Sequence, residues 1–411
     1  MYSLVDYGEM IADSLREDSY VQAIEAAVRR GSVVVDLGSG PGFFALIACR
    51  AGARRVYAID LTEIVQFGQN LARANNFIDR IEFLQGDSRQ IQLPERADVL
   101  VSDIRGSLPF YGCSIVSLED AHQRFLVEGG IMIPQRDTLY AAVVESEKFY
   151  KQITSPWQNS CYRLDLSFAL SHVLNELHTT HFTSEQLVTE PQAWCVIDYS
   201  KRLSTRAEAT LQFQATRRAV AHGIAIWFDT QLFENFGFSC APGGPITVYG
   251  HTFLPWSEPV AVTAGQEILV SLHADLVGSE YIWRWESKIY NEEKTLVRSF
   301  QQSTLQGALF SPQRLRRCAV DFVPRLSQAG RAETWLLTAM DGKTPLQQIA
   351  QAASERFPDI FPRRKRLSNA LQNWHRDSPR SKSNLKYRGS DRAGRSSRGI
   401  PHLSSTKLPT L

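Results

Sequence analysis

The 411-residue sequence has no long hydrophobic run. Its longest apolar stretches, such as Gly31–Leu37 and Ile131–Pro134, are far shorter than the roughly 20 residues that cross a bilayer. The N-terminus also lacks the basic and then apolar segments of a secretory signal. These absences predict a cytoplasmic protein that has no membrane partner.

Cysteine is scarce and scattered. The six cysteines lie far apart, and no two of them form a Cys-x-x-Cys pair. Zinc sites and the disulfide frameworks of small secreted domains both need cysteines at short, recurring spacings. We therefore predict no metal site, and we expect the cysteines to be reduced and buried.

Neither charge sign dominates the whole chain, because 45 Lys and Arg nearly balance 43 Asp and Glu. The balance hides an asymmetry. Residues 363–411 hold 13 Lys and Arg against two Asp, a net of +11, so the chain total of +2 leaves −9 for residues 1–362. The end of the chain is also rich in Ser and Gly, and such a composition cannot bury a core. We predict that residues 377–411 form a disordered basic tail.

The remaining composition is that of a globular protein, with 43% hydrophobic and 21% charged residues. These values exclude a chain that is wholly disordered, collagen-like or coiled-coil. A length of 411 residues exceeds one ordinary core and indicates two or three domains. We predict a first domain at 1–145, a second at 146–310 and a helical module at 325–376.

Strand and helix signals alternate along residues 33–145, a pattern typical of a parallel sheet covered by helices. The predicted strands are Ser32–Asp36, Arg55–Ile59, Ile81–Gln85, Ala97–Ser102, Gly130–Ile133 and Thr138–Val144, and the helices are Phe43–Ala51 and Glu63–Asn75. The next 150 residues show short alternating runs separated by Gly and Pro, which predict an antiparallel barrel or sandwich. Its strands include Ala193–Asp198, Gly223–Phe228, Thr247–Leu254 and Ser279–Trp285. The fold class is therefore α/β with a Rossmann-like domain, then a β-barrel domain and a small helical module.

A glycine-rich turn follows the first strand, in the sequence Asp36-Leu37-Gly38-Ser39-Gly40-Pro41-Gly42. Glycines let a ligand approach the backbone, and the following helix start offers free N–H groups. Asp60 ends the next strand, where a carboxylate can accept both hydroxyls of a ribose. The carboxylate of Asp36 would pair with an ammonium group, whereas it would repel a pyrophosphate. Together Gly38, Gly40, Asp36 and Asp60 favour S-adenosylmethionine over a dinucleotide.

These residues resemble the class I S-adenosylmethionine-dependent methyltransferases, and more specifically the protein arginine methyltransferases. That family opens with an M-L-x-D-x-x-R-x-x-x-Y helix, which the segment Met10–Tyr20 matches. The resemblance implies that Arg16 pairs with the methionyl carboxylate and that Met10 lies near the sulfonium. It also implies that Tyr7 and Leu61 flank the cofactor, and that Asp87 and Ser88 lie where the family contacts adenine.

The resemblance extends over about residues 5–300. Gly129–Pro134 is similar to a strand entry of the family, and Trp157–Asp198 is similar to the segment that carries its dimerisation arm. His222–Asp229 is similar to the barrel strand written H-x-x-x-x-W-F-D. The resemblance therefore implies a homodimer, with His222 as a structural histidine of the barrel.

The arginine-binding residues of the family are largely absent. The family holds the substrate guanidinium with two glutamates in a loop S-E-x-x-G-x-x-x-x-x-E, and a T-H-W loop supplies a histidine. Here the first glutamate position holds Asp103 and the second holds Gly112, while Val248 stands at the histidine position. Arg89 also stands where the family often has a glutamate at the adenine.

Three hypotheses remain open. In the first, the chain methylates a peptide or small-molecule nucleophile, with Asp103 as the catalytic carboxylate that orients the acceptor or acts as a base. In the second, the chain is an arginine methyltransferase with replacement acids drawn from Glu119, Asp120 or Glu145. In the third, it is an inactive cofactor-binding scaffold, and Asp103 only caps the end of its strand.

The helical signals of residues 331–376 comprise Glu333–Met340, Pro345–Phe357 and Arg366–Trp374. This segment resembles the winged-helix module of the pyrroloquinoline-quinone biosynthesis D-like family, which presents leader peptides to modifying enzymes. A helical bundle that binds no ligand is the alternative. The basic cluster Arg363–Arg366 and the tail are expected to be solvated, with no nucleic-acid partner.

Overall fold

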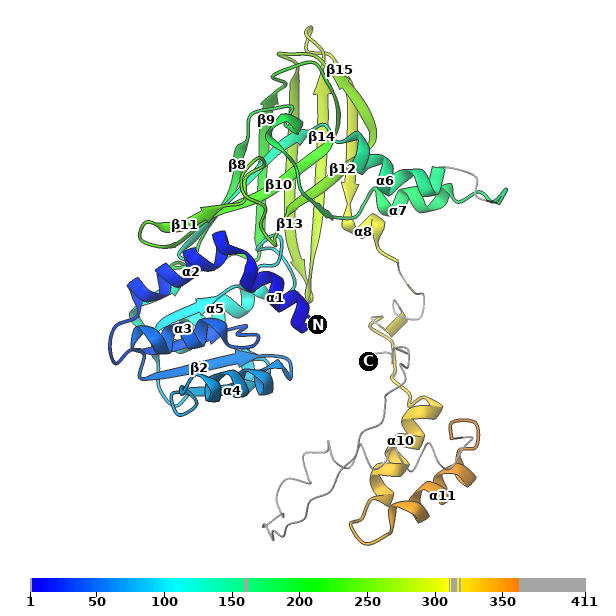
Figure 1. Ribbon diagram of the computed structural model, residues 1–411. Coiled ribbons are helices and arrows are strands. Elements are labelled where there is room, and N and C mark those ends of the chain that lie inside the picture. Colours follow the sequence, from blue (N-terminus) through cyan, green and yellow to red (C-terminus); the bar gives the residue numbers. More distant parts are fainter. Residues whose placement is uncertain (1, 159–161, 310, 312–315, 318, 362–411) are drawn as a thin grey trace, which may run out of the picture. The chain divides into compact units, whose positions relative to one another are not determined.

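A parallel five-stranded sheet forms the first part of the computed structural model, which describes residues 2–158, 162–309, 311, 316–317 and 319–361 (Figure 1). The strands lie in the order β3-β2-β1-β4-β5. They are β1 (Val33–Leu37), β2 (Arg55–Asp60), β3 (Ile81–Gln85), β4 (Ala97–Ser102) and β5 (Leu126–Ile133). The helices of this part are α1 (Leu4–Ala12), α2 (Ser14–Ala27), α3 (Phe43–Ala51), α4 (Ile64–Ala74) and α5 (Ser114–Phe125).

The sequence of this sheet explains its burial. All five residues of β1 are buried, because a parallel strand covered on both faces needs a continuous apolar run. The predicted Rossmann-like fold and the first five strands are confirmed, and α3 has the predicted bounds. The order of the strands reverses between β1 and β4, and ligands bind at such a point in parallel sheets.

The strand expected at Thr138–Val144 does not join the parallel sheet. It is part of β6 (Arg136–Val144), which pairs antiparallel with both β8 and β10. Assigning it to the alternating strand and helix pattern was therefore wrong. A buried apolar strand has the same sequence signature in either kind of sheet, so the pairing decides its membership.

Two antiparallel sheets form the next part of the chain, with strand orders β7-β12-β10-β6-β8 and β15-β14-β13-β9; β11 also pairs with β10. The strands are β7 (His178–Thr180), β8 (Gln192–Asp198), β9 (Arg206–Gln214), β10 (Ala219–Phe233), β11 (Phe236–Ser239), β12 (His251–Val262), β13 (Glu267–Val277), β14 (Glu280–Tyr290) and β15 (Leu296–Ser303). Five buried tryptophans fill their core, namely Trp194, Trp227, Trp256, Trp283 and Trp285. The predicted antiparallel domain is confirmed.

The expected strand Thr247–Leu254 begins only at His251. Residues 247–250 instead form a turn in which the Gly250 N–H donates to the Thr247 carbonyl over 3.3 Å, and Gly250 has a φ of +60°. This turn carries Tyr249 toward the parallel sheet, where it becomes part of the site described below.

Helices α6 (Glu147–Gln158) and α7 (Leu170–Val173) project together from the antiparallel part (Figure 1). Helix α7 lies within the segment expected to carry a dimerisation arm, whereas α6 ends where that segment begins. Phe168, just before α7, is 80% exposed. A short helix, α8 (Thr304–Gly307), follows β15.

The chain divides into two compact units, Met1–Leu309 and Phe310–Leu411. In the second unit, α10 (Gln328–Ala339) and α11 (Leu346–Arg356) share a small core of Leu336, Ile349, Ala350 and Ala353. Two of the three helices expected there are thus present. The third, Arg366–Trp374, and the basic tail lie outside the described residues.

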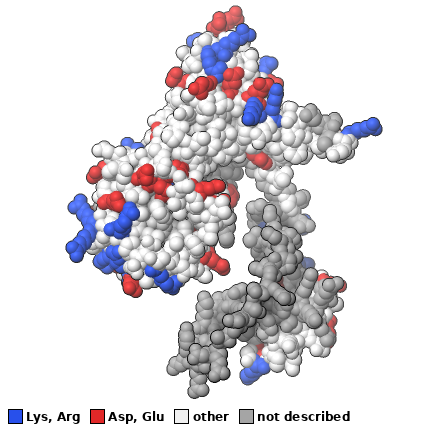
Figure 2. Space-filling view, viewed as in Figure 1, with Lys and Arg blue, Asp and Glu red and all other residues white. Residues whose placement is uncertain are grey.

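In the described part of the chain, every helix is too short or too polar to cross a membrane. Figure 2 shows acidic and basic side chains interspersed over the visible face of the parallel-sheet domain.

Candidate active site

A cavity of about 700 Å³ lies at the carboxyl ends of β1, β2 and β4. Its volume is in the range of small-molecule sites, and it occupies the point where the strand order reverses. Helices α1 and α2 line the cavity, together with the turn at 247–250 and the loop that follows β4. Seven of the expected cofactor residues line this cavity, namely Tyr7, Met10, Arg16, Gly38, Gly40, Asp60 and Leu61.

The glycine-rich turn needs its glycines. Gly38, Gly40 and Gly42 all have positive φ, at +73°, +51° and +82°. A Cβ atom on Gly40 would also lie 2.5 Å from the Tyr7 ring. Only glycine adopts this backbone without strain and lets Tyr7 pack against it.

The Asp60 carboxylate is positioned by the same turn. Its Oδ2 accepts the Gly40 N–H over 3.0 Å, and its Oδ1 accepts the N–H and hydroxyl of Thr62 over 2.8 and 2.7 Å. A carboxylate has about four acceptor sites, so capacity remains for a ligand hydroxyl.

Arg16 is 6% exposed and reaches the cavity from α2. Its Nε and Nη2 donate to Asp103 Oδ2 over 2.8 and 2.5 Å, while Nη1 pairs with Glu17. Each terminal nitrogen carries two N–H groups. One N–H of Nη2 therefore has no acceptor among the described residues and can meet a carboxylate.

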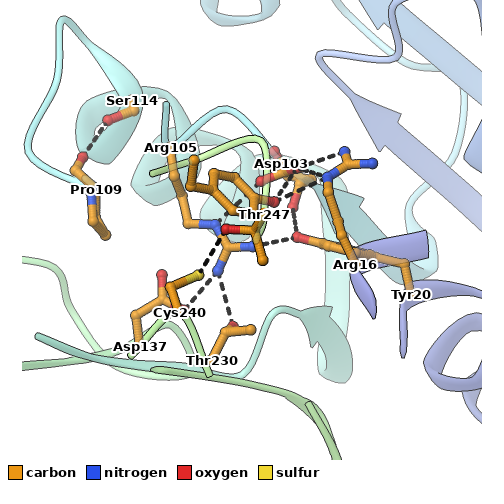
Figure 3. A network of polar contacts seen from close by, with 12 residues as sticks. Arg16, Tyr20, Asp103, Arg105, Pro109, Ser114, Asp137, Thr230, Cys240 and Thr247 are labelled. Atoms are coloured by element: carbon orange, nitrogen blue, oxygen red, sulfur yellow. Dashed lines mark hydrogen bonds and ion pairs between the residues drawn. The ribbon is translucent and has the colours of Figure 1, made fainter. Parts of the chain in front are cut away.

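Asp103 is the centre of a buried polar network (Figure 3). Its Oδ2 accepts from Arg16 and from the Tyr249 hydroxyl, the latter over 2.6 Å, and its Oδ1 accepts from Arg105 Nε over 3.2 Å. Burial would raise the pKa of Asp103, but Arg16 and Arg105 outweigh burial and lower it. Asp103 is therefore an anion with donors on both oxygens.

Arg105 was missed by the sequence analysis, and it is 1% exposed. Its Nη1 donates to Asp137 of β6 over 2.7 Å and to Thr230 of β10 over 2.9 Å, and its Nη2 donates to the Tyr20 hydroxyl over 2.6 Å. Arg105 thus ties the loop after β4 to the antiparallel sheet. A charged residue just after a buried strand was the signal that could have identified it.

Tyr249 and Glu17 were also missed. Tyr249 stands two residues after Thr247, in the loop that the sequence analysis judged by Val248 alone. Glu17 lies three residues before Tyr20 and seven before Ile24, and this helical spacing places it on the buried face of α2. Both residues line the cavity.

Three of the expected cofactor residues do not line the cavity. Asp36 is 1% exposed, and its carboxylate accepts the Ala45 N–H over 2.9 Å at the start of α3. Asp87 pairs with Arg89 at 2.6 Å, and Ser88 is buried beside them. Asp36 and Asp87 accept backbone N–H groups nearby and Ser88 is buried, and a cofactor role for these three residues stays a prediction.

The suggested replacement acids also lie away from the cavity. Glu119 accepts the Leu203 N–H over 2.8 Å, Asp120 pairs with Arg124 at 2.5 Å and Glu145 pairs with Arg217 at 2.7 Å. Each carboxylate is thus engaged elsewhere. His222 accepts the Ser146 N–H over 3.2 Å within the antiparallel part, in keeping with a structural role.

Comparison with known proteins supports the same family. Residues 135–277 match the arginine methyltransferase oligomerization subdomain, and residues 20–123 match FtsJ-like methyltransferase. Protein arginine N-methyltransferase 1.1 of Arabidopsis thaliana is 28% identical over 268 residues, which are 63% of this chain and 68% of that protein. The probable histone-arginine methyltransferase CARM1 of Oryza sativa subsp. indica is 31% identical over 66% of this chain and 54% of its own length. The chain thus spans about half of the rice relative.

Solved structures share the fold. The Trypanosoma brucei PRMT1 enzyme-prozyme heterotetrameric complex with AdoHcy superposes with a TM-score of 0.65 at 20% identity, covering 72% of this chain and 97% of the other. Arabidopsis thaliana protein arginine methyltransferase 10 gives the same TM-score over 73% and 97%. The chain is a distant homologue of the protein arginine methyltransferases. In this PRMT-like chain the matched oligomerization subdomain begins at β6, in agreement with the antiparallel pairing of that strand.

Proposed function

We propose that this PRMT-like chain binds S-adenosylmethionine in the 700 Å³ cavity and transfers its methyl group to a peptide or small-molecule nucleophile. The observation that carries the proposal is the meeting of Arg16, the glycine turn and Asp60 on the wall of one cavity at the switch point of the sheet. These groups come from three separate elements, and each suits a different part of the cofactor.

The residues present fit the cofactor. Arg16 offers a free N–H to the methionyl carboxylate, the turn at Gly38–Gly40 leaves room against the backbone, and Asp60 retains an acceptor site for a ribose hydroxyl. When bound, the cofactor supplies a methyl group activated by a sulfonium. Because that group carries the reactivity, the protein mainly has to orient the acceptor.

Asp103 is better placed to orient than to remove a proton. A general base works best with a pKa near the working pH, whereas Arg16 and Arg105 lower the pKa of Asp103 despite its burial. An acceptor with a neutral lone pair needs no proton removal before the transfer. We therefore assign Asp103 the role of orienting the acceptor.

The same network supports an alternative function. Both Asp103 oxygens have donors from this chain, as a purely structural carboxylate would. An inactive cofactor-binding scaffold would retain the cavity and never release Asp103. The arginine methyltransferase alternative lacks this support, because Glu119, Asp120 and Glu145 are all engaged outside the cavity.

The proposal is tested in two steps. Titration calorimetry with S-adenosylhomocysteine measures whether the wild-type chain binds the cofactor product, and micromolar affinity is expected. Radiolabelled methyl transfer from S-adenosylmethionine into fractionated lysate pools then measures the activity. Transfer that disappears in Asp103→Asn, while the cofactor affinity stays within a few-fold, supports the enzyme. Binding without transfer into any pool supports the scaffold, and no binding rejects both.

The chain is also proposed to form a homodimer. The match to an oligomerization subdomain supports this proposal, as does the projecting arm of α6 and α7 with its exposed Phe168. Helix α1 has no buried residue in the single chain, although Tyr7 and Met10 on it line the cavity. A second copy that covers α1 would stabilise this wall of the site.

A further inference from the structure

Glu17 holds a buried carboxylate oxygen that lacks a partner. The residue is 6% exposed and lines the cavity beside Arg16. Its Oε1 pairs with Arg16 Nη1, whereas its Oε2 has no hydrogen-bond partner among the described residues. Leaving a buried acceptor unsatisfied costs free energy, so a donor is expected to fill this position when the site is occupied.

The other acids near Arg16 cannot serve in its place. Asp103 already has donors on both oxygens. Asp36, which the sequence analysis assigned to an ammonium, is capped by the Ala45 N–H and does not line the cavity. The Oε2 atom of Glu17 is thus an acceptor without a partner on the residue that follows Arg16, whose Nη2 keeps one free N–H.

Adjacent opposite charges are what an amino-acid zwitterion requires. The carboxylate and the ammonium of such a group are attached to the same carbon, so a site must present a cation and an anion side by side. Arg16 and Glu17 are in direct contact on one turn of α2 and both line the cavity. Each member of this pair retains one open position, a donor on Arg16 and an acceptor on Glu17.

We propose that Glu17 accepts the α-ammonium of the cofactor's methionyl end, while the carboxylate of the same end lies on Arg16. This inference rests on the proposed cofactor. It assigns the recognition of the amino group to a side chain of α2 and not to Asp36 of β1.

The electrostatics of Glu17 agree with this role. Burial raises the pKa of Glu17 to about 7, even though Arg16 opposes the shift. In the single chain this carboxyl is therefore only partly ionised at neutral pH. A cationic group at Oε2 would stabilise the ionised form.

Three ligands isolate the proposed contact. S-adenosylhomocysteine has both charges of the amino-acid end, its desamino analogue keeps only the carboxylate, and 5′-methylthioadenosine has neither. Wild-type protein is expected to bind S-adenosylhomocysteine about tenfold or more tightly than the desamino analogue. Glu17→Gln is expected to lose this preference and to bind 5′-methylthioadenosine as the wild type does.

Glu25→Gln is the matched control, because Glu25 lies on the same helix and also pairs with an arginine, Arg50, but at the surface. It should leave all three affinities unchanged. The proposal is overturned if the wild type binds the desamino analogue as tightly as S-adenosylhomocysteine, a comparison that needs no variant to fold. It is also overturned if Glu17→Gln weakens 5′-methylthioadenosine equally. Failure of the wild type to bind S-adenosylhomocysteine would instead reject the proposed function, and this inference with it.

Discussion

The turn after β1 and the loop after β4 lie at the same edge of the parallel sheet, yet they use their polar groups in opposite ways. Beside the turn, helix α2 holds two groups that have no partner among the described residues, an Arg16 N–H and Glu17 Oε2. The loop side is closed, since Asp103 and Arg105 pair with each other and with the antiparallel sheet. We call these the cofactor side and the acceptor side of the cavity.

The contrast separates two tasks. Open donors and acceptors at a cavity wall are costly without a ligand, so they point to binding. A buried charged network that satisfies itself points to structure, and it leaves an acceptor little freedom to enter. The acceptor side of this chain therefore acts first as the joint between its two kinds of sheet.

The largest expected effect comes from breaking that joint. Arg105→Met leaves Asp137 buried without its cation, and removing one partner of a buried ion pair costs about 3–5 kcal/mol. We expect the free energy of unfolding, measured by urea titration, to fall by this amount. Arg54→Met removes an exposed ion pair with Glu95 and should leave the free energy of unfolding unchanged. Equal effects of the two variants would show that the acceptor side is not a structural joint.

A comparable effect, spread over several pH units, is expected from the titration of Asp36, a buried residue of β1. Burial raises the pKa of Asp36 to about 7, although the Ala45 N–H opposes this. Because the folded state then holds the proton more tightly than the unfolded state, stability is greatest below about pH 4 and falls as the pH rises to about 7. The total over this range is on the order of 4 kcal/mol.

Asp36→Asn should remove this decline, as measured by urea titrations at several pH values. Asp98→Asn is the control, because Asp98 also accepts a backbone N–H at an end of β1 but is exposed. If Asp36→Asn keeps the wild-type slope, the burial of this carboxyl does not determine its ionisation. The pKa of Asp103 is shifted in the opposite direction, because Arg16 and Arg105 lower it despite burial.

The sequence predicted the cofactor side better than the acceptor side, for a physical reason. Gly38, Gly40 and Asp60 lie at the ends of successive strands, so local spacing alone brings them together. The Arg105 network joins residues that are 32 and 125 positions apart, and no local pattern encodes such pairs. The sequence does not decide the role of Asp36, because an acid at a strand end can serve a ligand or cap a helix, and the structure adds a contact with the Ala45 N–H.

The sheet to which β6 belongs was predicted wrongly for the same reason. Its sequence is as apolar as that of β4, and only its pairing with β8 and β10 assigns it to the antiparallel sheet. Glu17, in contrast, could have been predicted. Its spacing from Tyr20 and Ile24 places a charge on the buried face of α2, which is a signal for a functional or paired group.

A third prediction tests the cofactor side directly. Asp60→Ala removes a carboxylate that is proposed to accept ribose hydroxyls, and charge-assisted hydrogen bonds contribute about 1.5–3 kcal/mol. We expect calorimetry to show a corresponding loss of S-adenosylhomocysteine affinity. Asp87→Ala should change the affinity less than about twofold, because Asp87 pairs with Arg89 outside the cavity. Equal losses would return Asp87 to the site and contradict the placement seen in the structure.

The smallest expected effect separates the two sides by their dependence on a second copy. Helix α1 carries Tyr7 and Met10 of the cofactor side but has no buried residue, whereas the Arg105 network is complete within one chain. If the projecting arm covers α1 of a partner, Phe168→Ser should weaken the dimer by about 1–2 kcal/mol through lost apolar burial. Light scattering over a dilution series measures this change.

The same variant should weaken S-adenosylhomocysteine binding about threefold to tenfold at a concentration where the wild type is dimeric, because α1 then lacks its cover. The slope of its unfolding free energy against urea concentration should equal that of the wild type, since the acceptor side needs no partner. Val196→Ser, at an exposed position of β8, is the control and should change neither the mass nor the affinity. A wild-type chain that stays monomeric with full cofactor affinity would show that a single copy completes both sides of the cavity.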